Sequence, residues 1–591
     1  MKKIKFIMAT VIFLAITFSC EDFLDKQPLG ATSETVFYNA KGIDALLIGT
    51  YGLISGGAVW EVSWGASIQN WTYGSAASDD AYKGSEIGDQ IPANEIERWS
   101  VDPINEYPGH KWKLCLGMGV NRANEVLRII GLTDNITDAQ RTSFQAEARF
   151  LRAFFNLEAW LVFKNIPILT EETEDPTLVP NTIDALPFII EDFVFAAANL
   201  PSSQTDVGRP TSWAAKGMAA KAYMQILDYT NAKPLLDDII NNGGFTLMPN
   251  FLDNYEIANN NNAESIFEIQ ANVNDGACCS GNAEMGIGLN WPHGADIGMC
   301  CGFHQPSQNL VNAHKVDVNG WPMFNTFNIV DLKNDQGVAS EDVFVPFVDV
   351  VDPRLDWTVS RRGIPYRDWG INRGRDWIRR QDEGGPYLPS SKPFFYQSER
   401  YSLSTTSGWM TGNNANNYRY LRLSHILLWR AEVAADEGDL VTAVTYVDMV
   451  RQRAANEVVM GLVSIYNLPP AAYPWGPGTD AGDYLTGGDV DWTQPAANYD
   501  VQPYITFPDK AYAVEAVRWE LRLEFATEGH RFFDLRRWGI ITETLNDFAA
   551  ADLRIRNFMS GATFDERDKY QPIPQAQLDL QPDVLVQNPD Y

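Results

Sequence analysis

Apolar positions recur at helical spacing in several separate parts of the chain. The longest pattern covers residues 141–163 and carries two apolar stripes, one containing Phe144 and Ala148 and the other containing Phe150 and Phe154. A helix that is apolar on two faces packs between neighbours and not on a surface. This segment therefore predicts a buried helix inside a stack of helices.

Two further segments predict pairs of antiparallel helices. Residues 420–437 and 439–454 keep helical spacing on facing sides and are separated at Gly438-Asp439, and a similar pair runs from 213 to 242. The offsets of small and apolar residues resemble the tetratricopeptide pattern, although the two pairs are not in tandem. Another helix is expected at roughly 510–528.

Long stretches between the helices are rich in Gly, Asn, Pro, Asp and aromatic residues, and loops of this length usually serve function. We therefore predict a mostly α fold, a tetratricopeptide-like helical scaffold with long irregular insertions, within one large domain over residues 20–591. The scaffold is expected at about 35–54, 109–242, 418–455 and 509–552, and the loop-rich parts at about 55–108, 245–417 and 462–508.

The first twenty residues predict export. Three lysines precede an apolar run at 6–18 that is too short to span a bilayer, so residues 1–19 are typical of a signal peptide. Cys20 follows directly and resembles the lipidated cysteine of a bacterial lipobox, although Thr17 stands where Leu is commonest. A lipid anchor attaches a protein without spanning the membrane. The alternative is an ordinary signal peptide followed by a chance cysteine.

The charge balance excludes some partners. The net charge of −30 repels nucleic acid and anionic lipid, so we expect no nucleic-acid partner and a membrane contact through the anchor alone. A group of arginines between 361 and 380 is the one basic cluster. It could pair with uronic-acid carboxylates, hold acidic loops or face another protein.

Aromatic residues in the loop-rich stretches are the candidate ligand-binding groups. The chain has 18 Trp and 23 Tyr. Six Trp in helix-like segments, Trp519 and Trp538 among them, are expected in the core, and the other twelve fall in loops. Flat rings beside polar groups suit sugars, whereas local packing of the loops is the competing interpretation. The candidates are Trp64, Trp71, Tyr73, Trp291 and Trp321, with Asp79, Lys83, His293, Trp369 and Arg373 as weaker ones.

Two adjacent cysteine pairs, Cys278-Cys279 and Cys300-Cys301, stand about twenty residues apart. In an exported protein they favour a loop stapled by disulfides, whose pairing cannot be deduced from sequence. Adjacent cysteines fit a four-thiolate metal site poorly, and free buried thiols are the third alternative. No cofactor is predicted. A structural calcium ion is compatible with the many carboxylates, but no loop has the spacing that identifies one.

One segment invites a catalytic interpretation, with His530 as a base oriented by Asp534. The neighbouring Arg531, Arg536 and Arg537 lie among acidic residues at helical spacings, which favours a structural ion-pair network. No nucleophile elbow, phosphate loop or metal motif is present, and no pair of carboxylates is singled out for glycoside hydrolysis. We therefore predict no catalytic residue and no metal ligand.

Motifs in order along the chain resemble those of the SusD/RagB family of outer-membrane glycan-binding lipoproteins. The strongest lies at 520–539 (ELRLEFATEGHRFFDLRRWG). Others lie at 20–25, 78–84, 146–154, 209–211, 305–310, 418–422, 572–574 and 587–591. The double-cysteine segment around 278–301 departs from the family pattern, in a region where members vary, and so bears on the choice of ligand.

The resemblance implies a tetratricopeptide-like fold and a lipoprotein on the bacterial cell surface, at the outer membrane. It implies capture of a poly- or oligosaccharide and its delivery to a SusC-like TonB-dependent transporter, without chemistry on the glycan. Two alternatives remain: a surface lipoprotein that hydrolyses glycosides, and a SusD-like lid for peptides or another nutrient. Neither the glycan nor its linkage can be read from the sequence.

Overall fold

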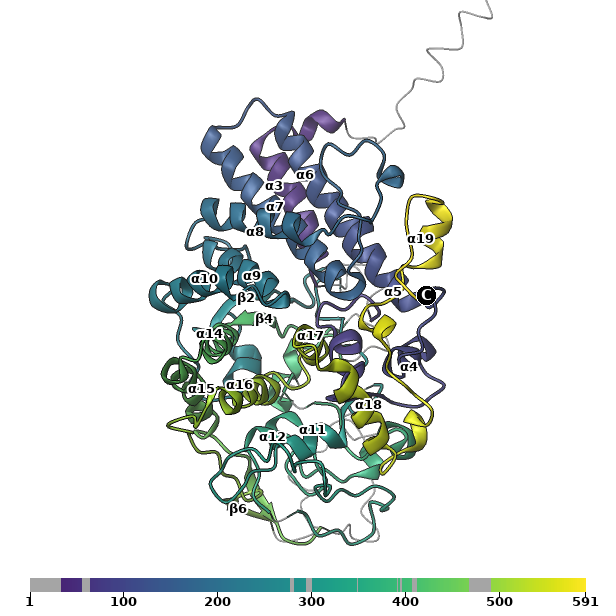
Figure 1. Ribbon diagram of the computed structural model, residues 1–591, viewed down its shortest axis with the longest axis vertical. Coiled ribbons are helices and arrows are strands. Elements are labelled where there is room, and N and C mark those ends of the chain that lie inside the picture. Colours follow the sequence, from purple (N-terminus) through teal and green to yellow (C-terminus); the bar gives the residue numbers. More distant parts are fainter. Residues whose placement is uncertain are drawn as a thin grey trace, which may run out of the picture.

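A computed structural model of the chain describes residues 33–55, 64–276, 281–293, 300–347, 349–390, 392–393, 396–405, 412–466 and 490–591 (Figure 1). The predicted signal peptide, the lipidation site Cys20 and the pair Cys278-Cys279 lie outside these residues.

The upper part of the molecule in Figure 1 is a stack of helices around α7 (Asp138–Phe163). The α7 helix begins at a capping box, in which the Thr137 hydroxyl accepts from the Gln140 N–H and the Gln140 side chain accepts from the Thr137 N–H. From Ala146 onward both apolar stripes of α7 are buried, which confirms the prediction of a helix packed between neighbours. Around it lie α3 (Ala40–Tyr51), α6 (Asn121–Gly131), α8 (Leu186–Asn199) and α9 (Ser212–Gln225), and α10 (Tyr229–Asn242) packs against α9.

The second predicted helix pair is α14 (Leu423–Glu437) and α15 (Leu440–Ala454), and α16 (Lys510–Glu524) packs against both. Gly438 ends α14 with a φ of +79°, a left-handed conformation that favours glycine. Asp439 then caps α15 by accepting from the Thr442 N–H. The two turn residues that the sequence offers therefore set the hairpin between the helices.

Shorter elements join the scaffold to the loop-rich stretches. After α16 the chain forms α17 (Arg531–Arg537), α18 (Ile541–Asp552) and α19 (Gln575–Leu580). A π-helical turn, η3 (Trp71–Ala76), contacts α17 from the other end of the sequence. The remaining short helices include α4 (Ile91–Glu97), α5 (Glu106–Trp112), η4 (Lys113–Val120), α11 (Gln308–Ala313), α12 (Arg354–Thr358) and α13 (Gln381–Gly384).

Strands are few, and those that the structure describes form two-stranded antiparallel sheets. The strands β1 (Ala81–Gly84) and β3 (Phe303–Pro306) pair, as do β2 (Ser265–Ile269) and β4 (Tyr418–Arg422), and β5 (Met460–Val463) and β6 (Val490–Pro495). Because β4 runs directly into α14, the second sheet joins a loop-rich stretch to the scaffold. The fold is mostly α with long irregular insertions, as the sequence predicts.

The largest hydrophobic core lies inside the helical scaffold, and smaller cores lie within the loop-rich stretches. Among the helices that the structure describes, not one combines the length and the apolar character required to traverse a bilayer.

Candidate functional site

The loop-rich half has a hydrophobic core of its own, which we call the indole cluster. It is built from Trp71, Trp291, Trp369 and Trp377, with Phe303 and Tyr366 among the other members. Trp291 is fully buried, and Trp71 is 1% exposed and donates from its indole N–H to the Gly286 carbonyl. Trp64 packs against the cluster and is partly buried. The structure thus brings four of the predicted aromatic residues together, but as packing side chains whose faces meet other side chains.

Three other candidate residues also have internal partners. Tyr73 belongs to the main core and donates to the Gly65 carbonyl. Lys83 donates to two carbonyls of its own loop, and burial lowers the pKa of its amine to about 8. Trp321 is half-buried and stacks on Tyr504, with ring centroids 6.0 Å apart. These side chains hold loops in place in this structure.

Most of the basic cluster of the sequence also faces inward, although Arg375 and Arg380 are exposed. Arg361 makes two hydrogen bonds to Asp356, and Arg379 pairs with Glu86 and Asp89. Arg373 is 4% exposed, and the Arg400 guanidinium lies 4.6 Å from the ring centroid of Trp369. Of the three interpretations that the sequence left open, the contacts favour the one in which these arginines hold acidic loops.

The second cysteine pair forms a disulfide between the neighbours Cys300 and Cys301, which closes no loop. Cys115 is a free, buried thiol. His293 is half-buried nearby in sequence, and burial together with the Arg379 charge lowers its pKa. Within the parts of the chain that the structure describes, no group of three or more His, Cys, Asp or Glu side chains is arranged to hold a metal ion.

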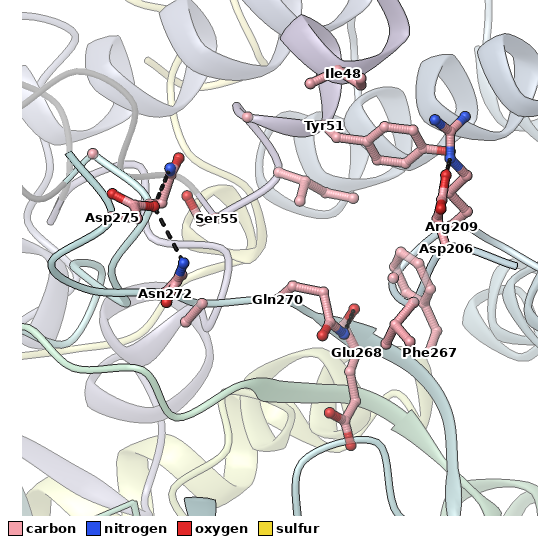
Figure 2. Close-up of a pocket in the computed structure, with 17 residues that line it drawn as sticks. Ile48, Tyr51, Ser55, Asp206, Arg209, Phe267, Glu268, Gln270, Asn272 and Asp275 are labelled. Carbon is pink, nitrogen blue, oxygen red and sulfur yellow. Dashed lines mark hydrogen bonds and ion pairs between the residues drawn. The ribbon is translucent and has the colours of Figure 1, made fainter. Parts of the chain in front are cut away.

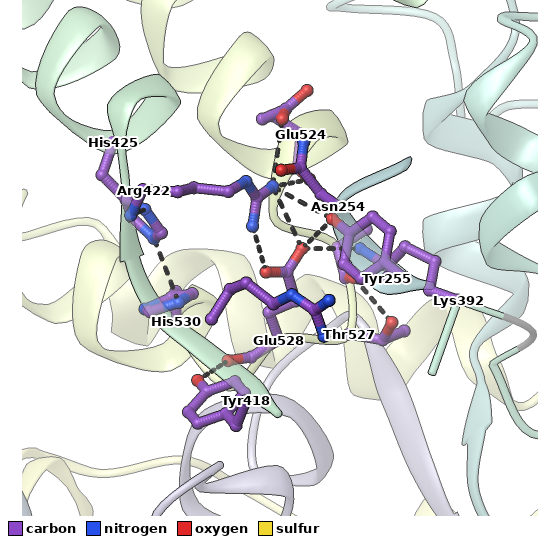
Figure 3. A network of polar contacts seen from close by, with 12 residues as sticks. Asn254, Tyr255, Lys392, Tyr418, Arg422, His425, Glu524, Thr527, Glu528 and His530 are labelled. Carbon is purple, nitrogen blue, oxygen red and sulfur yellow. Dashed lines mark hydrogen bonds and ion pairs between the residues drawn. The ribbon is translucent and has the colours of Figure 1, made fainter. Parts of the chain in front are cut away.

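The segment that suggested catalysis lies in a buried network of charges (Figure 3). Glu528 accepts from Arg422 at 2.5 Å and from Lys392 at 2.8 Å. Burial alone would raise the pKa of Glu528, but the two cations outweigh it and hold that pKa at about 2. The carboxylate is therefore ionised at neutral pH and ties a loop lysine to the scaffold arginine at the end of β4.

His530 does not have the environment of a catalytic base. Its Nε2 lies 3.4 Å from Nε2 of His425, and Asp534 pairs with Arg537 instead of orienting it. Burial, reinforced by the Lys221 charge, lowers the pKa of His530 to about 3. The geometry favours the structural ion-pair network that the sequence predicted. Most partners, however, come from distant segments: Arg531 pairs with Asp79, which is 452 residues away along the chain.

Asp79, a weaker ligand candidate of the sequence, sits between two guanidiniums. It pairs with Arg531 at 2.8 Å and Arg522 at 3.0 Å. Burial pushes its pKa up, and the two arginines more than offset that effect, so the pKa lies below its usual value. Its role in this structure is to join the loop after η3 to α16 and α17.

One open pocket, of about 420 Å³, lies between the end of α3, the 206–209 turn and β2 (Figure 2). Most of its polar groups already have partners, either in the lining or next to it. Arg209 pairs with Asp206, Asp44 and Glu147, and Asp275 accepts from Asn282 at 2.7 Å. A ligand here would have to displace existing hydrogen bonds, each worth about 1 kcal/mol.

A second open space, of about 320 Å³, lies between α16, α18 and the loop at 324–328; we call it the α16–α18 groove. Phe324 and Phe327 are half-buried and meet the Trp519 ring edge-on, with centroids 5.4 and 4.9 Å from it. The Arg518 guanidinium lies 5.0 Å from the centroid of Trp538. Aromatic rings therefore line this groove together with charged groups.

Half of the charged, amide and hydroxyl side chains that line the α16–α18 groove have no hydrogen-bond or ion-pair partner among the residues that the structure describes. Across the described ranges, five lining side chains make no hydrogen bond or ion pair through their polar atoms: Glu515, Arg518, Glu543, Thr544 and Asp547. Arg522 and Arg531 also line the groove but are held by Asp79. Compared with the pocket beside α3, this groove offers donors and acceptors that have no partner in the described parts of the chain, and they lie beside aromatic rings.

Residues 263–591, more than half of the chain, match the SusD family. The chain belongs to the SusD family. Residues 22–224 match a second SusD-like family, described as starch-binding associating with outer membrane.

Two SusD-like relatives show how far the similarity extends. A SusD-like protein of Bacteroides ovatus is 30% identical over 296 residues, which is 46% of this chain and 50% of that protein. The SusD-like protein P25 of Formosa agariphila is 22% identical over 99% of this chain and 98% of its own length.

Solved SusD-like structures share the fold over nearly the whole chain. A SusD superfamily protein from Bacteroides vulgatus is 18% identical, has a TM-score of 0.66 and covers 94% of this chain and 100% of its own. Surface glycan-binding protein A from Bacteroides thetaiotaomicron, in complex with laminarihexaose, is 20% identical, has a TM-score of 0.62 and covers 93% of this chain and 99% of its own.

The sequence interpretation missed the groove of this SusD-family member. It expected Trp519 and Trp538 in the core, and each is indeed only 7% exposed, yet both also line the groove. Phe324 and Phe327 were not among the predicted ligand-binding residues. One available signal was the spacing of Glu543 and Asp547, which puts two acids on one face of α18 without a basic partner at helical distance.

Proposed function

We propose that this SusD-family protein binds a poly- or oligosaccharide at the bacterial cell surface and delivers it to a SusC-like TonB-dependent transporter. In this proposal a lipid on Cys20 anchors the chain to the outer membrane, and the protein carries out no chemistry on the glycan. Glycan binding is the central part, and delivery and anchoring follow from the family.

The observation that carries the proposal is the fold shared over nearly the full chain with a surface glycan-binding protein in complex with laminarihexaose. The second family description, which joins starch binding to the outer membrane, points the same way. A non-catalytic role is supported by the segment around His530, whose charged groups pair with one another and whose histidine pKa of about 3 is too low for a base at neutral pH.

Calorimetry of the purified Cys20→Ser protein against a panel of neutral and acidic polysaccharides tests glycan binding. We expect saturable binding to at least one of them and no new reducing ends after prolonged incubation. Binding to none, with peptides found by mass spectrometry in the protein purified from its native membrane, would favour a peptide lid. Release of reducing ends would favour a hydrolase.

Fractionation of cells tests the anchor. The natural chain should sediment with outer membranes, and the Cys20→Ser chain should be released, because loss of the acyl chains removes most of the hydrophobic attachment. Retention of the variant in membranes that lack the transporter would contradict lipid anchoring. Co-purification of the natural chain with a TonB-dependent barrel would test the delivery step.

A further inference from the structure

We propose that the α16–α18 groove is a saccharide-binding site and that it takes a neutral saccharide. The inference rests on the proposed function and adds to it a place and a class of ligand. The groove has a volume of about 320 Å³, at the lower end of the ~300–1,000 Å³ common for small-molecule sites. It therefore suits a short segment of a glycan chain.

The aromatic wall of the groove can contact the apolar C–H face of a sugar ring. Phe324 and Phe327 are half-buried, in contrast to the fully buried Trp291 of the indole cluster. Their edge-on contacts with Trp519 fix the orientation of the two rings. Trp519 is itself held by a hydrogen bond of 3.1 Å from its indole N–H to the Ala313 carbonyl. A wall whose rings are fixed in advance loses little side-chain entropy on binding.

The polar side chains of the groove supply both kinds of hydrogen-bonding group. Arg518 offers donors, and its Nε is buried without an acceptor in the part of the chain that the structure describes. Glu515, Glu543 and Asp547 offer acceptors, and the Thr544 hydroxyl can do either. Since each sugar hydroxyl donates and accepts, a saccharide can use all of these groups. A buried donor without a partner is costly, so a ligand that accepts from Arg518 gains from satisfying it.

The mixture of charges selects a neutral ligand. An acidic saccharide would bring carboxylates towards Glu515, Glu543 and Asp547, in a chain whose net charge is already −30. A cationic ligand would meet Arg518, whereas Arg522 and Arg531 in the same groove are paired with Asp79. Neutral hydroxyl groups are repelled by neither set.

Calorimetry on the Cys20→Ser protein tests the inference, with neutral gluco-, xylo-, manno- and galacto-oligosaccharides in one arm and oligouronates in the other. We expect binding in the neutral arm. Arg518→Ala should weaken it at least about tenfold, because a hydrogen bond to a charged group is lost. The matched control is Arg128→Ala, which removes a half-exposed arginine of α6 that pairs with Glu125. The control should bind as the parent protein does.

A second variant keeps the test decisive if Arg518→Ala unfolds. Thr544→Trp adds bulk at the groove wall without removing a charge. It should abolish binding of the neutral oligosaccharide, and its melting temperature should stay close to that of the parent.

Failure of the groove inference is distinguishable from failure of the proposed function. Neutral binding that both folded groove variants leave unchanged would place the site elsewhere while the function stands. Stronger binding in the oligouronate arm would overturn the neutral class. Absence of binding in both arms would overturn the inference and the proposed function together.

Discussion

Two aromatic regions of this molecule look alike in composition and differ in what surrounds them. The indole cluster gathers four tryptophans in the loop-rich half, and the α16–α18 groove gathers two tryptophans and two half-buried phenylalanines beside the scaffold. In the indole cluster Trp71 and Trp291 have almost no exposed surface. In the groove the rings border open space and five polar side chains that have no hydrogen-bond partner within the described ranges.

The difference shows that aromatic content alone does not identify a binding surface. Long irregular segments cannot bury an apolar face by helical periodicity, so large rings supply the core that holds them together. A binding surface needs rings that remain accessible and polar groups whose hydrogen bonds are still to be made. The groove meets both conditions, and the indole cluster lacks the accessible rings in this structure.

The largest expected effect comes from removing a buried ring from the indole cluster. Trp291→Ala should lower the free energy of unfolding by about 3–5 kcal/mol, because it leaves a cavity in the indole cluster. Urea denaturation measures this. Trp492→Ala, which removes a tryptophan that is 47% exposed, is the matched control and should cost less than about 1 kcal/mol. Unchanged stability of Trp291→Ala together with lost glycan binding would show that this ring serves the ligand after all.

The next-largest effect concerns the close approach of two backbone segments at Gly529 and Gln69. Gly529 has a φ of +77°, and a Cβ there would lie 2.0 Å from the Gln69 carbonyl oxygen. Gly529→Ala should therefore destabilise the protein by about 2–4 kcal/mol, since it forces the two segments apart. Gly539→Ala is the control, because that glycine also has a positive φ but has open space around it. Equal melting temperatures for the two variants would contradict the steric account.

We expect acid to destabilise the protein at the indole cluster through His304. The His304 ring lies against Trp71, with ring centroids 5.9 Å apart. Burial, with a smaller contribution from the Lys392 charge, lowers the pKa of His304 to about 3. An unfolded histidine titrates near 6.5. The unfolded chain therefore binds the proton first, and the contribution of His304 to stability falls as the pH drops below about 6.5.

His304→Gln removes this titration. Measured by urea denaturation, the stability of the variant relative to the parent should rise by roughly 2 kcal/mol between pH 6.5 and 5. The comparison between the two proteins cancels the titration of all other groups. A constant difference over that range would show that His304 is accessible to protons in the folded state.

Much of the fold follows from the sequence, since the spacing of apolar residues located α7, α9, α10, α14, α15 and α16 within a few residues. Local signals also located their ends, such as Gly438 and Asp439. These elements depend on neighbours three or four positions away, which a sequence displays directly.

Whether the aromatic residues of the loops are buried or exposed could not be predicted in the same way. Trp71 is buried because Gly286 and Phe303 reach it from more than two hundred residues away. Likewise the partner of Arg531 is Asp79, not an acid of its own helix. The groove depends on a similar meeting of Phe324 with Trp519. Contacts at such separations leave no periodic trace in the chain.

The smallest expected effect tests the charge of the groove itself. Glu543 is exposed on α18 and has no ion-pair partner among the described residues, so Glu543→Gln should change the free energy of unfolding by less than about 0.5 kcal/mol. It keeps a hydrogen-bond acceptor for a neutral sugar and removes one negative charge. The ratio of oligouronate to neutral affinity should therefore rise about 1.5- to 5-fold, the range of a single exposed charge pair.

Changing the ionic strength tests whether the change in affinity ratio is electrostatic. The change in ratio should be larger at low ionic strength and shrink as salt screens the remaining charges, because the Debye length falls from about 30 Å at 0.01 M to about 8 Å at 0.15 M. Glu437→Gln on α14 removes an acid that pairs with Lys233 outside the groove, and it should leave the ratio unchanged. If both variants shift the ratio equally, the net charge of the chain and not the groove decides between neutral and acidic glycans.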